Sequence, residues 1–421
     1  MSYRVCFAFL LLFESILFAD ELDIELEGAF EIEDQNTSFV VEKISPTEKD
    51  LTHSLTGLAQ SRNWYFETDF GDDYFGTYRA NLFGEVRWRE SLKAFLSWEI
   101  DGDVYESDRL ELLADLTDRE TTEHLFNEAF IDVNLNKQLY VRVGKQTLQW
   151  GRTFFWNPID LVSVEEESFL DLGVELEGTK GVKITAPIGN DKTIYLFVDT
   201  GDDFEDIAAT IRFEWLLHDT EYGISLWAKE STDPVLGFDF STTINDFIIA
   251  GETTFTTSAR KQKVRRVDPS IVEIFRENSS LINQTSLNVT KLWDWETTDR
   301  ISLTAEFFYN SEGYDENVFE DPLLAAVLFA NGLYEQNYHG KYYAALFSSI
   351  QRFPFYDLKT YLNAITNLSD NSGIINLGVE IPLTYNAKIE LNGFEFFGSE
   401  PTEYRLFTQK HAINLNLIIE F

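Results

Sequence analysis

The chain has 421 residues, and its 72 Asp and Glu against 33 Lys and Arg give a formal net charge of −39. This charge excludes a protein that binds nucleic acid through a basic surface, because phosphate contacts need clustered cations. The mean hydropathy of −0.19 and the lack of any apolar run of about 18 residues exclude a helical membrane protein, while 15% aromatic residues exclude disorder.

The first 19 residues have the features of a secretory signal. Arg4 supplies a positive start, and an apolar stretch follows at 5–13. We therefore expect a signal peptide at 1–19 and one mature domain over 20–421. Cys6, the single cysteine, lies in this signal, so the mature chain is expected to have no thiol for a disulfide, a metal or catalysis.

From residue 24 onward, apolar and polar side chains alternate in segments of about ten residues. In 77–89, for example, Leu82 and Trp88 fall on one face of the predicted strand, and Arg79 and Arg87 on the other. Eighteen segments have this pattern: 24–32, 77–89, 92–101, 127–135, 138–146, 179–187, 193–200, 208–216, 220–229, 236–244, 247–256, 281–292, 299–310, 338–350, 357–367, 373–381, 386–396 and 406–421.

Alternation alone also fits a soluble β-sandwich with one wet face, so length and connections have to decide. Segments of about 9–11 residues suit tilted strands that cross a bilayer, whereas sandwich strands are shorter. The connections alternate between short and long, as in barrels with short periplasmic turns and long external loops. The short ones include 90–91, 136–137, 217–219 and 245–246, and the long ones are 33–76, 102–127, 147–178, 257–280 and 311–337.

The sequence thus predicts an all-β protein, a transmembrane antiparallel barrel of about 18 strands (16–18). A sheet in hydrocarbon has to close, because each backbone polar group needs a partner. The last strand carries Leu417, Ile419 and Phe421 on one face. This ending resembles the terminal strand that bacterial outer-membrane proteins present to their barrel assembly machinery, which implies the outer membrane of a Gram-negative cell.

A barrel of this size has more room than inward side chains can fill, so a water-filled bore is expected. Polar residues predicted to line it carry both signs of charge, with a modest acidic excess. They are Arg79, Glu85, Arg87, Glu99, Asp132, Arg142, Lys183, Arg212, Glu214, Glu252, Glu306, Glu380, Lys388 and Glu390. A wide, charged, hydrated bore is a diffusion path for small solutes.

One stretch carries a more specific pattern, a strand end of the form G-x-Q-x-x-x-W-G followed by N-P-x-D. It resembles a motif of porin-like bacterial outer-membrane barrels, a group with large uncharacterised families. The matching residues are Gly144, Gln146, Trp150, Gly151, Asn157, Pro158 and Asp160. The resemblance covers about twenty residues and implies the fold rather than a substrate.

We predict that the loop 151–177 folds into the bore and narrows it, because a glycine facing inward lets other backbone approach. Arg142 and Arg152 would then oppose acidic residues of the loop across the bore. The alternative is that the motif only shapes an external loop. The predicted constriction comprises Arg142, Gly144, Gln146, Arg152, Asp160, Glu165, Glu166 and Asp171.

Two charged stretches lie in predicted loops. The acidic one, 101–128, is expected to be a solvated loop, although divalent ions bridging to lipopolysaccharide are an alternative. The basic one either dips into the bore to bind an anionic solute or pairs with acidic loops or lipid sugars. It contains Arg260, Lys261, Lys263, Arg265 and Arg266.

The sequence therefore predicts an outer-membrane, porin-like channel that passes small hydrophilic solutes with a weak cation preference. The alternatives are a transporter of a hydrophobic or other specific compound, plugged by 33–76 or 311–337, and a non-conducting surface barrel. We expect no enzyme activity, cofactor or metal, because none of the five histidines lies in a recognisable catalytic setting. Expected partners are outer-membrane lipid, lipopolysaccharide, the assembly machinery and small solutes, in a monomer or a trimer.

Overall fold

The computed structural model describes residues 51–421, except 70, 107–121, 163–167, 172–175, 202–206, 231, 277–280, 295–299, 354–355 and 407–408. The predicted signal at 1–19 and the predicted strand at 24–32 lie outside the described residues. In the described part of the chain, no helix has both the length and the apolar character needed to cross a bilayer.

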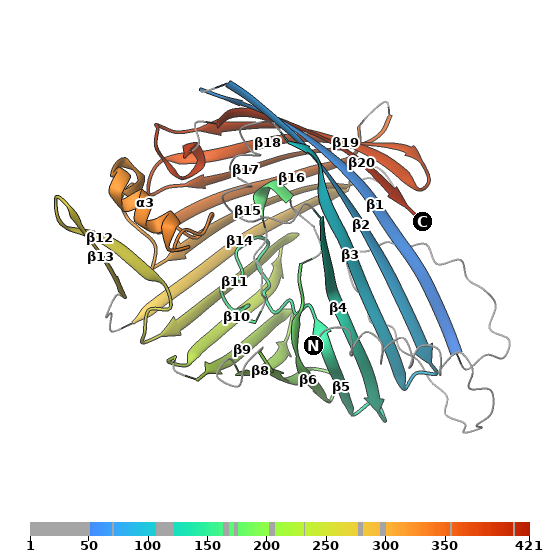
Figure 1. Ribbon diagram of the computed structural model, residues 1–421. Helices are drawn as coiled ribbons and strands as arrows, with labels where there is room; N and C mark the ends of the chain where they lie inside the picture. The colour runs from blue at the N-terminus through green and yellow to red at the C-terminus, as the bar shows by residue number, and fades with distance from the viewer. Residues whose placement is uncertain are drawn as a thin grey trace. The chain divides into compact units, whose positions relative to one another are not determined.

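Eighteen strands form one antiparallel sheet that closes on itself, because β1 pairs with both β2 and β20 (Figure 1). The predicted fold class is therefore confirmed. The strands are β1 Leu51–Thr68, β2 Gly71–Trp88, β3 Leu92–Glu106, β4 Thr122–Leu135, β5 Leu139–Gln146, β6 Thr179–Ile188, β7 Lys192–Asp199, β8 Ala208–Leu217, β9 Thr220–Lys229, β10 Val235–Ile244, β11 Phe247–Thr256, β14 Ile282–Asp294, β15 Arg300–Asn310, β16 Tyr342–Phe353, β17 Tyr356–Asn367, β18 Ser372–Thr384, β19 Ala387–Phe397 and β20 Gln409–Glu420.

The barrel is apolar outside and polar inside. On β20, Ile413 and Leu415 are 50% and 44% exposed, whereas Asn414 and Asn416 between them are buried. A soluble sheet would have the opposite arrangement, so this exterior suits contact with acyl chains. Near the short turns, Trp88 and Trp293 are exposed, as expected of the aromatic girdle at a membrane interface.

Short turns lie at one end of the barrel and the longer connections at the other. At the loop end, β12 (Gln262–Asp268) and β13 (Ile271–Arg276) form a separate two-stranded hairpin. It lies beside the helix α3 (Pro322–Ala330) and the short 3-10 helix η3 (Val318–Glu320), as Figure 1 shows. The long loop predicted at 311–337 therefore contains a helix.

The prediction of a long loop at 33–76 is wrong, because β1 occupies Leu51–Thr68 and only residues 69–70 separate it from β2. The eighteen strands of the described residues thus begin with β1. The outward positions of β1 include Gly57, Ala59 and Ser61, and these small side chains leave no apolar stripe to recognise. The predicted loop 257–280 also differs, since it contains the hairpin of β12 and β13.

The last residue closes the seam of the barrel. The backbone N–H and C=O of Phe421 both bond to Gly57, at 2.9 and 2.7 Å. A Cβ built on Gly57 would lie 2.5 Å from the ring of Phe421, so a glycine there makes room for the aromatic ring. Ile419 and Leu417 continue outward along the same strand, 40% and 39% exposed. Their predicted role as an assembly signal stays a prediction.

Gly144 on β5 has a conformation that other residues adopt at a cost. Its φ is +134°, and a Cβ there would lie 2.2 Å from the carbonyl oxygen of Ala129 and 2.8 Å from Cα of Phe130. The two strands approach so closely only because residue 144 lacks a side chain.

We predict that Gly144→Ala destabilises the barrel by about 1–3 kcal/mol or more, because it adds backbone strain and forces β4 and β5 apart. The urea midpoint of the refolded protein in detergent micelles measures this effect. Gly84→Ala is the matched control, since nothing lies within 4 Å of its Cβ position, and it should change stability by less than about 0.5 kcal/mol. Equal midpoints for both variants would contradict the prediction.

Candidate functional site in the barrel lumen

Charged side chains of the inner wall pair with neighbours on the same or adjacent strands and, for Arg212 and Asp239, across the one strand between them. Because inward residues recur at every second position, opposite charges on facing strands come into register. The pairs at the wall include Arg79 with Glu99 (3.1 Å), Lys93 with Glu85 (2.9 Å), Arg142 with Asp132 (2.6 Å), Arg212 with Asp239 (2.7 Å), and Lys388 with Glu380 (3.1 Å) and Glu390 (3.4 Å).

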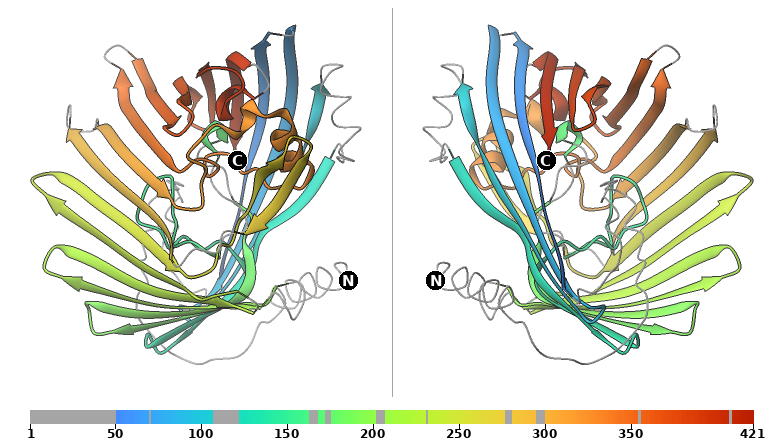
Figure 2. Two further views of the ribbon diagram at one scale, coloured as in Figure 1. Left: turned by 90° about the vertical axis from the view of Figure 1, so that its left-hand side faces the viewer. Right: turned by 90° about the vertical axis from the view of Figure 1, so that its right-hand side faces the viewer.

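The connection between β5 and β6 turns into the barrel instead of extending away from it, as both views in Figure 2 show. Its first part packs against the inner wall, where Leu148 and Trp150 join a buried cluster with Phe197 and Trp227. The backbone N–H of Thr147 donates to the carboxylate of Glu128 at 2.7 Å. We refer to the described part of this connection, 147–162, 168–171 and 176–178, as the in-folded loop.

Two wall carboxylates hold the tip of the in-folded loop through five consecutive backbone N–H groups. Glu252 on β11 accepts from Arg152 and from Thr153 (2.8 Å). Glu306 on β15 accepts from the next three residues, Phe154 (3.1 Å), Phe155 (3.0 Å) and Trp156 (2.9 Å), and from the hydroxyl of Ser286. Backbone groups that would otherwise be buried without partners are thereby satisfied.

The guanidinium group of Arg152 meets three acidic side chains of the wall, which lie on β8, β9 and β10. It bonds to Asp239 at 2.5 Å, to Glu221, and to Glu214 at 3.3 Å. Arg212 bonds to the same Asp239 and Glu214, at 2.7 and 2.8 Å. The group has two cations and three carboxylates, so it has one net negative charge; we call it the Arg152 cluster.

A glycine makes room for the Arg152 cluster. A Cβ on Gly223 of β9 would lie 2.3 Å from an oxygen of Asp239 and 2.6 Å from a nitrogen of Arg212. Any other residue at 223 would displace this buried pair from the wall.

The other side of the loop tip packs on aromatic residues. Trp156 is fully buried and stacks on Phe308, with ring centroids 5.4 Å apart and planes at 10°. Phe155 contacts Phe347 at 5.8 Å between centroids. The indole N–H of Trp156 donates to the carbonyl of Asn337 at 3.0 Å. The tip therefore lies between an ionic wall and an aromatic wall.

The predicted constriction residues do not all gather at one point. Arg142 pairs with Asp132 instead of facing the loop carboxylates, and its guanidinium lies 3.7 Å from the ring centre of Phe130. The predicted opposition between Arg152 and the loop's own acids is also corrected, because wall carboxylates bind Arg152. In each case a carboxylate of the wall provides the counter-charge.

The remaining residues of that prediction have different positions. Gln146 is fully buried at the end of β5 and donates to the carbonyl of Gly181 at 3.3 Å. Asp160 lies in the in-folded loop, with its backbone N–H bonded to Asn157 at 3.0 Å. Asp171 ends the short helix η1 (Phe169–Asp171), and Glu165 and Glu166 lie outside the described residues.

The basic stretch lies at the loop end and is neutralised by other loops. Arg265 pairs with Glu273 across the hairpin at 2.7 Å, and Arg266 pairs with Asp321 at 2.6 Å. Lys261 pairs with Glu335. In this stretch, Lys263 donates to the carbonyl of Gly313 at 3.1 Å and the backbone N–H of Arg260 to Glu312 at 2.7 Å. These contacts fit the expected pairing with acidic loops.

Sequence reasoning missed the partners of Arg152 and the role of two glutamates. Asp239 and Glu221 were not singled out, and Glu252 and Glu306 were expected to face water as ordinary wall charges. Their alternation on β9, β10, β11 and β15 was the available signal, since it places acidic side chains inward on neighbouring strands. No pattern in the sequence indicated which of them would bind the loop.

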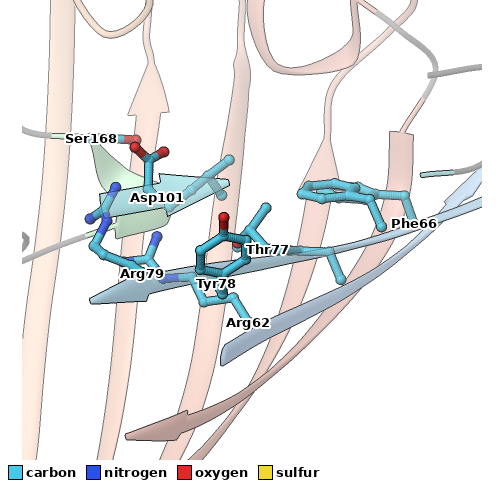
Figure 3. Close-up of a pocket in the computed structure, with 10 residues that line it drawn as sticks. Arg62, Phe66, Thr77, Tyr78, Arg79, Asp101 and Ser168 are labelled. Atoms are coloured by element: carbon cyan, nitrogen blue, oxygen red, sulfur yellow. The ribbon is translucent and has the colours of Figure 1, made fainter. Parts of the chain in front are cut away.

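A cavity of about 250 Å³ lies at the inner wall between β1, β2, β3 and the in-folded loop. Figure 3 shows Arg79, Asp101 and Ser168 at one end of this pocket and Phe66 at the other. Its lining residues are Arg62, Trp64, Phe66, Phe75, Thr77, Tyr78, Arg79, Asp101, Ser168 and Leu170.

At the loop end, a buried carboxylate joins three external connections. Glu403, in the short helix η4 (Glu403–Arg405), accepts from Tyr343 Oη (2.8 Å), Asn367 Nδ2 (2.7 Å) and the backbone N–H of Asn337 (2.8 Å). Its own N–H donates to Asp370 at 2.7 Å. Burial raises the pKa of Glu403 to about 8, in spite of these three donors.

Comparison with solved structures finds this fold in bacterial outer-membrane porins. OccAB1 of Acinetobacter baumannii has a TM-score of 0.54 at 9% identity, with 88% of this chain and 96% of that chain covered. The BenF-like porin of Pseudomonas fluorescens Pf-5 has a TM-score of 0.53 at 10% identity, with 88% of this chain and 98% of that chain covered. OprD of Pseudomonas aeruginosa has a TM-score of 0.51 at 10% identity, with 88% of this chain and 95% of that chain covered. No protein-family model and no curated protein matches the sequence.

Because the sequence identity to these structures is so low, the similarity establishes the fold alone. Together with the apolar exterior and closed sheet, it identifies a multi-pass β-barrel of the outer membrane, which confirms the predicted localisation. The residues of the in-folded loop have to be interpreted from their own contacts.

We predict that Glu306→Ala loosens the loop tip, because three buried N–H groups lose their acceptor and each unsatisfied group costs about 1–3 kcal/mol. Hydrogen exchange at residues 154–156 should become at least tenfold faster. Glu390→Ala, which removes an inner-wall carboxylate paired with Lys388 away from the loop, should leave exchange there unchanged. Protection at 154–156 that survives in Glu306→Ala would show that the carboxylate does not anchor the tip.

The raised pKa of Glu403 predicts a pH-dependent contribution to stability. In the folded state Glu403 keeps its proton up to about pH 8, whereas the usual pKa of a glutamate is 4.5. Stability should therefore fall as pH rises from 4.5 through 8, by up to about 1.4 kcal/mol per pH unit. Glu403→Gln cannot ionise and should lack this dependence. Parallel denaturation curves from pH 5 to 9 measure it, and equal slopes in both proteins would refute the assignment.

Proposed function

We propose that the protein is an outer-membrane channel through which small hydrophilic solutes diffuse, with a weak preference for cations. One observation carries the proposal, namely that wall carboxylates hold a loop inside a closed polar barrel. A folded-in segment that is fixed by five backbone hydrogen bonds narrows the bore at a defined level. Narrow, charged bores select solutes by size and charge.

The cation preference rests on the charges at this level. The Arg152 cluster has one net negative charge. A net negative potential at a narrow point raises the local concentration of cations and lowers that of anions.

We also propose that the barrel is not an enzyme. Histidine is the commonest general base, yet His339 is buried between the rings of Tyr314 and Phe319, each 4.7 Å away between centroids. Burial and nearby lysines lower its pKa to about 3, so it stays neutral and closed off from solutes. His411 at the loop end of β20 pairs with Glu395.

Recording in planar lipid bilayers tests the channel and its selectivity. The purified protein should give discrete, ohmic current steps, and a KCl gradient should give a reversal potential of the sign expected for K⁺. Arg152→Gln should raise the permeability ratio of K⁺ to Cl⁻ roughly tenfold, because one unit charge at ~6 Å in water amounts to ~0.7 kcal/mol, and its removal favours the cation and disfavours the anion by that amount each.

The matched control is Arg265→Gln, whose charge is paired with Glu273 on the external hairpin and should not affect selectivity. Bilayers that stay silent at high protein load would refute the channel. Steps with an anion-selective reversal potential would refute the cation preference alone.

A further inference from the structure

We propose that the 250 Å³ pocket on β1, β2 and β3 is a subsite that binds one neutral, polyhydroxylated ring, such as a monosaccharide, inside the lumen. This inference rests on the proposed channel function and narrows the solutes that it serves. The pocket has an aromatic end and a polar end, and the in-folded loop contributes Ser168 and Leu170 to its lining.

The aromatic end is a strip of three rings. Trp64 and Phe66 are two positions apart on β1, and Phe75 is the register partner of Trp64 on β2. Their planes lie within 17° of one another, with centroids of Trp64 5.4 Å from Phe66 and 6.2 Å from Phe75. Both phenylalanines keep partly exposed surface. The apolar surface that these rings leave exposed suits the C–H face of a sugar ring, which is also apolar.

The polar end provides a donor and an acceptor next to each other. Arg79 and Asp101 are register partners on β2 and β3. The Nε of Arg79 is held by Glu99 at 3.1 Å, but its buried Nη1 has no hydrogen-bond partner among the described residues. The Asp101 carboxylate makes no ion pair or hydrogen bond with the residues that the structure describes. A hydroxyl group both accepts and donates, so two adjacent hydroxyls satisfy both side chains.

The charges at this end disfavour ionic solutes. The cations Arg62 and Arg79 are balanced by Asp101 and by Glu99, which bonds to Arg79. A carboxylate ligand that accepted from Arg79 would lie against Asp101 and near Glu99, and an ammonium ligand would lie against Arg79 and Arg62. Burying either charge beside a like charge is costly, whereas a neutral hydroxyl avoids both penalties. The pocket therefore selects hydrogen-bonding capacity without net charge.

The size of the pocket limits the ligand to about one ring. Sites for drug-sized ligands have volumes of about 300–1,000 Å³, and 250 Å³ is below that range. Trp64 and Phe75 lie four residues from the ends of β1 and β2 at the loop end of the barrel. A ring bound here would be held on the side from which external solutes enter.

Saturation-transfer NMR on the purified, folded protein in detergent tests the inference with three probes. D-Glucose should bind saturably, and D-sorbitol, which has the hydroxyl groups but no ring, at least fivefold more weakly. D-Glucuronate, which has the ring and a negative charge, should also bind at least fivefold more weakly than glucose. If sorbitol bound as tightly as glucose, the role of the aromatic strip would be overturned. If glucuronate bound more tightly than glucose, the neutral character of the site would be overturned.

Two variants locate the binding. Phe66→Leu with Phe75→Leu removes two rings and should weaken glucose binding at least fivefold, and Asp101→Asn should weaken it about threefold. Phe307→Leu, a lipid-facing ring that is 43% exposed, is the matched control and should bind as the unmodified protein does. Heat-modifiable migration on unboiled gels confirms that each barrel has folded. Unchanged glucose binding in the folded double variant would overturn the proposed location.

The bilayer recordings separate this inference from the proposed function. Ohmic channels whose protein binds no glucose would overturn the subsite and leave the channel standing. Glucose binding by a protein that gives no current would overturn the channel, and the pocket would then serve a surface receptor.

Discussion

The whole structure depends on the requirement that every backbone polar group facing hydrocarbon has a partner within the protein. An open sheet has two edges with unpaired groups, so the sheet must close, and here β1 provides the closure by pairing with both β2 and β20. The reciprocal hydrogen bonds between Gly57 and Phe421 complete it. With eighteen strands the closed sheet encloses more space than its inward side chains fill.

The same requirement explains how a loop can lie in that space. When a loop packs against the inner wall, its backbone N–H and C=O groups are buried and need hydrogen-bond partners. In a closed sheet no strand edge is free to provide them. Glu252 and Glu306 supply acceptors to five consecutive N–H groups. These glutamates are inner-wall charges in the sequence pattern, but in the structure they anchor the element that shapes the bore. Polarity inside the barrel therefore has a structural role as well as a functional one.

The sequence was sufficient to predict the barrel, because alternation, strand length and loop lengths all follow from one physical arrangement. It missed β1, whose outward residues Gly57, Ala59 and Ser61 are too small to form a stripe. From Gly144 and the Trp-Gly and Asn-Pro pattern, the sequence also predicted that the loop after β5 folds into the bore. It did not find the partners of Arg152, because contacts between the loop and β8, β9 and β10 depend on how far the loop crosses the bore, which periodicity does not encode.

The loop tip also connects the lumen with the external surface. Asn337 accepts from the indole of Trp156 through its carbonyl and donates to Glu403 through its N–H. Trp156 in turn is held by Glu306. A continuous chain of hydrogen bonds thus runs from β15 through the loop tip to the buried carboxylate that joins three external connections. Because Glu403 is protonated over the neutral pH range, a rise of external pH can ionise it, and the loop tip lies two contacts away from it.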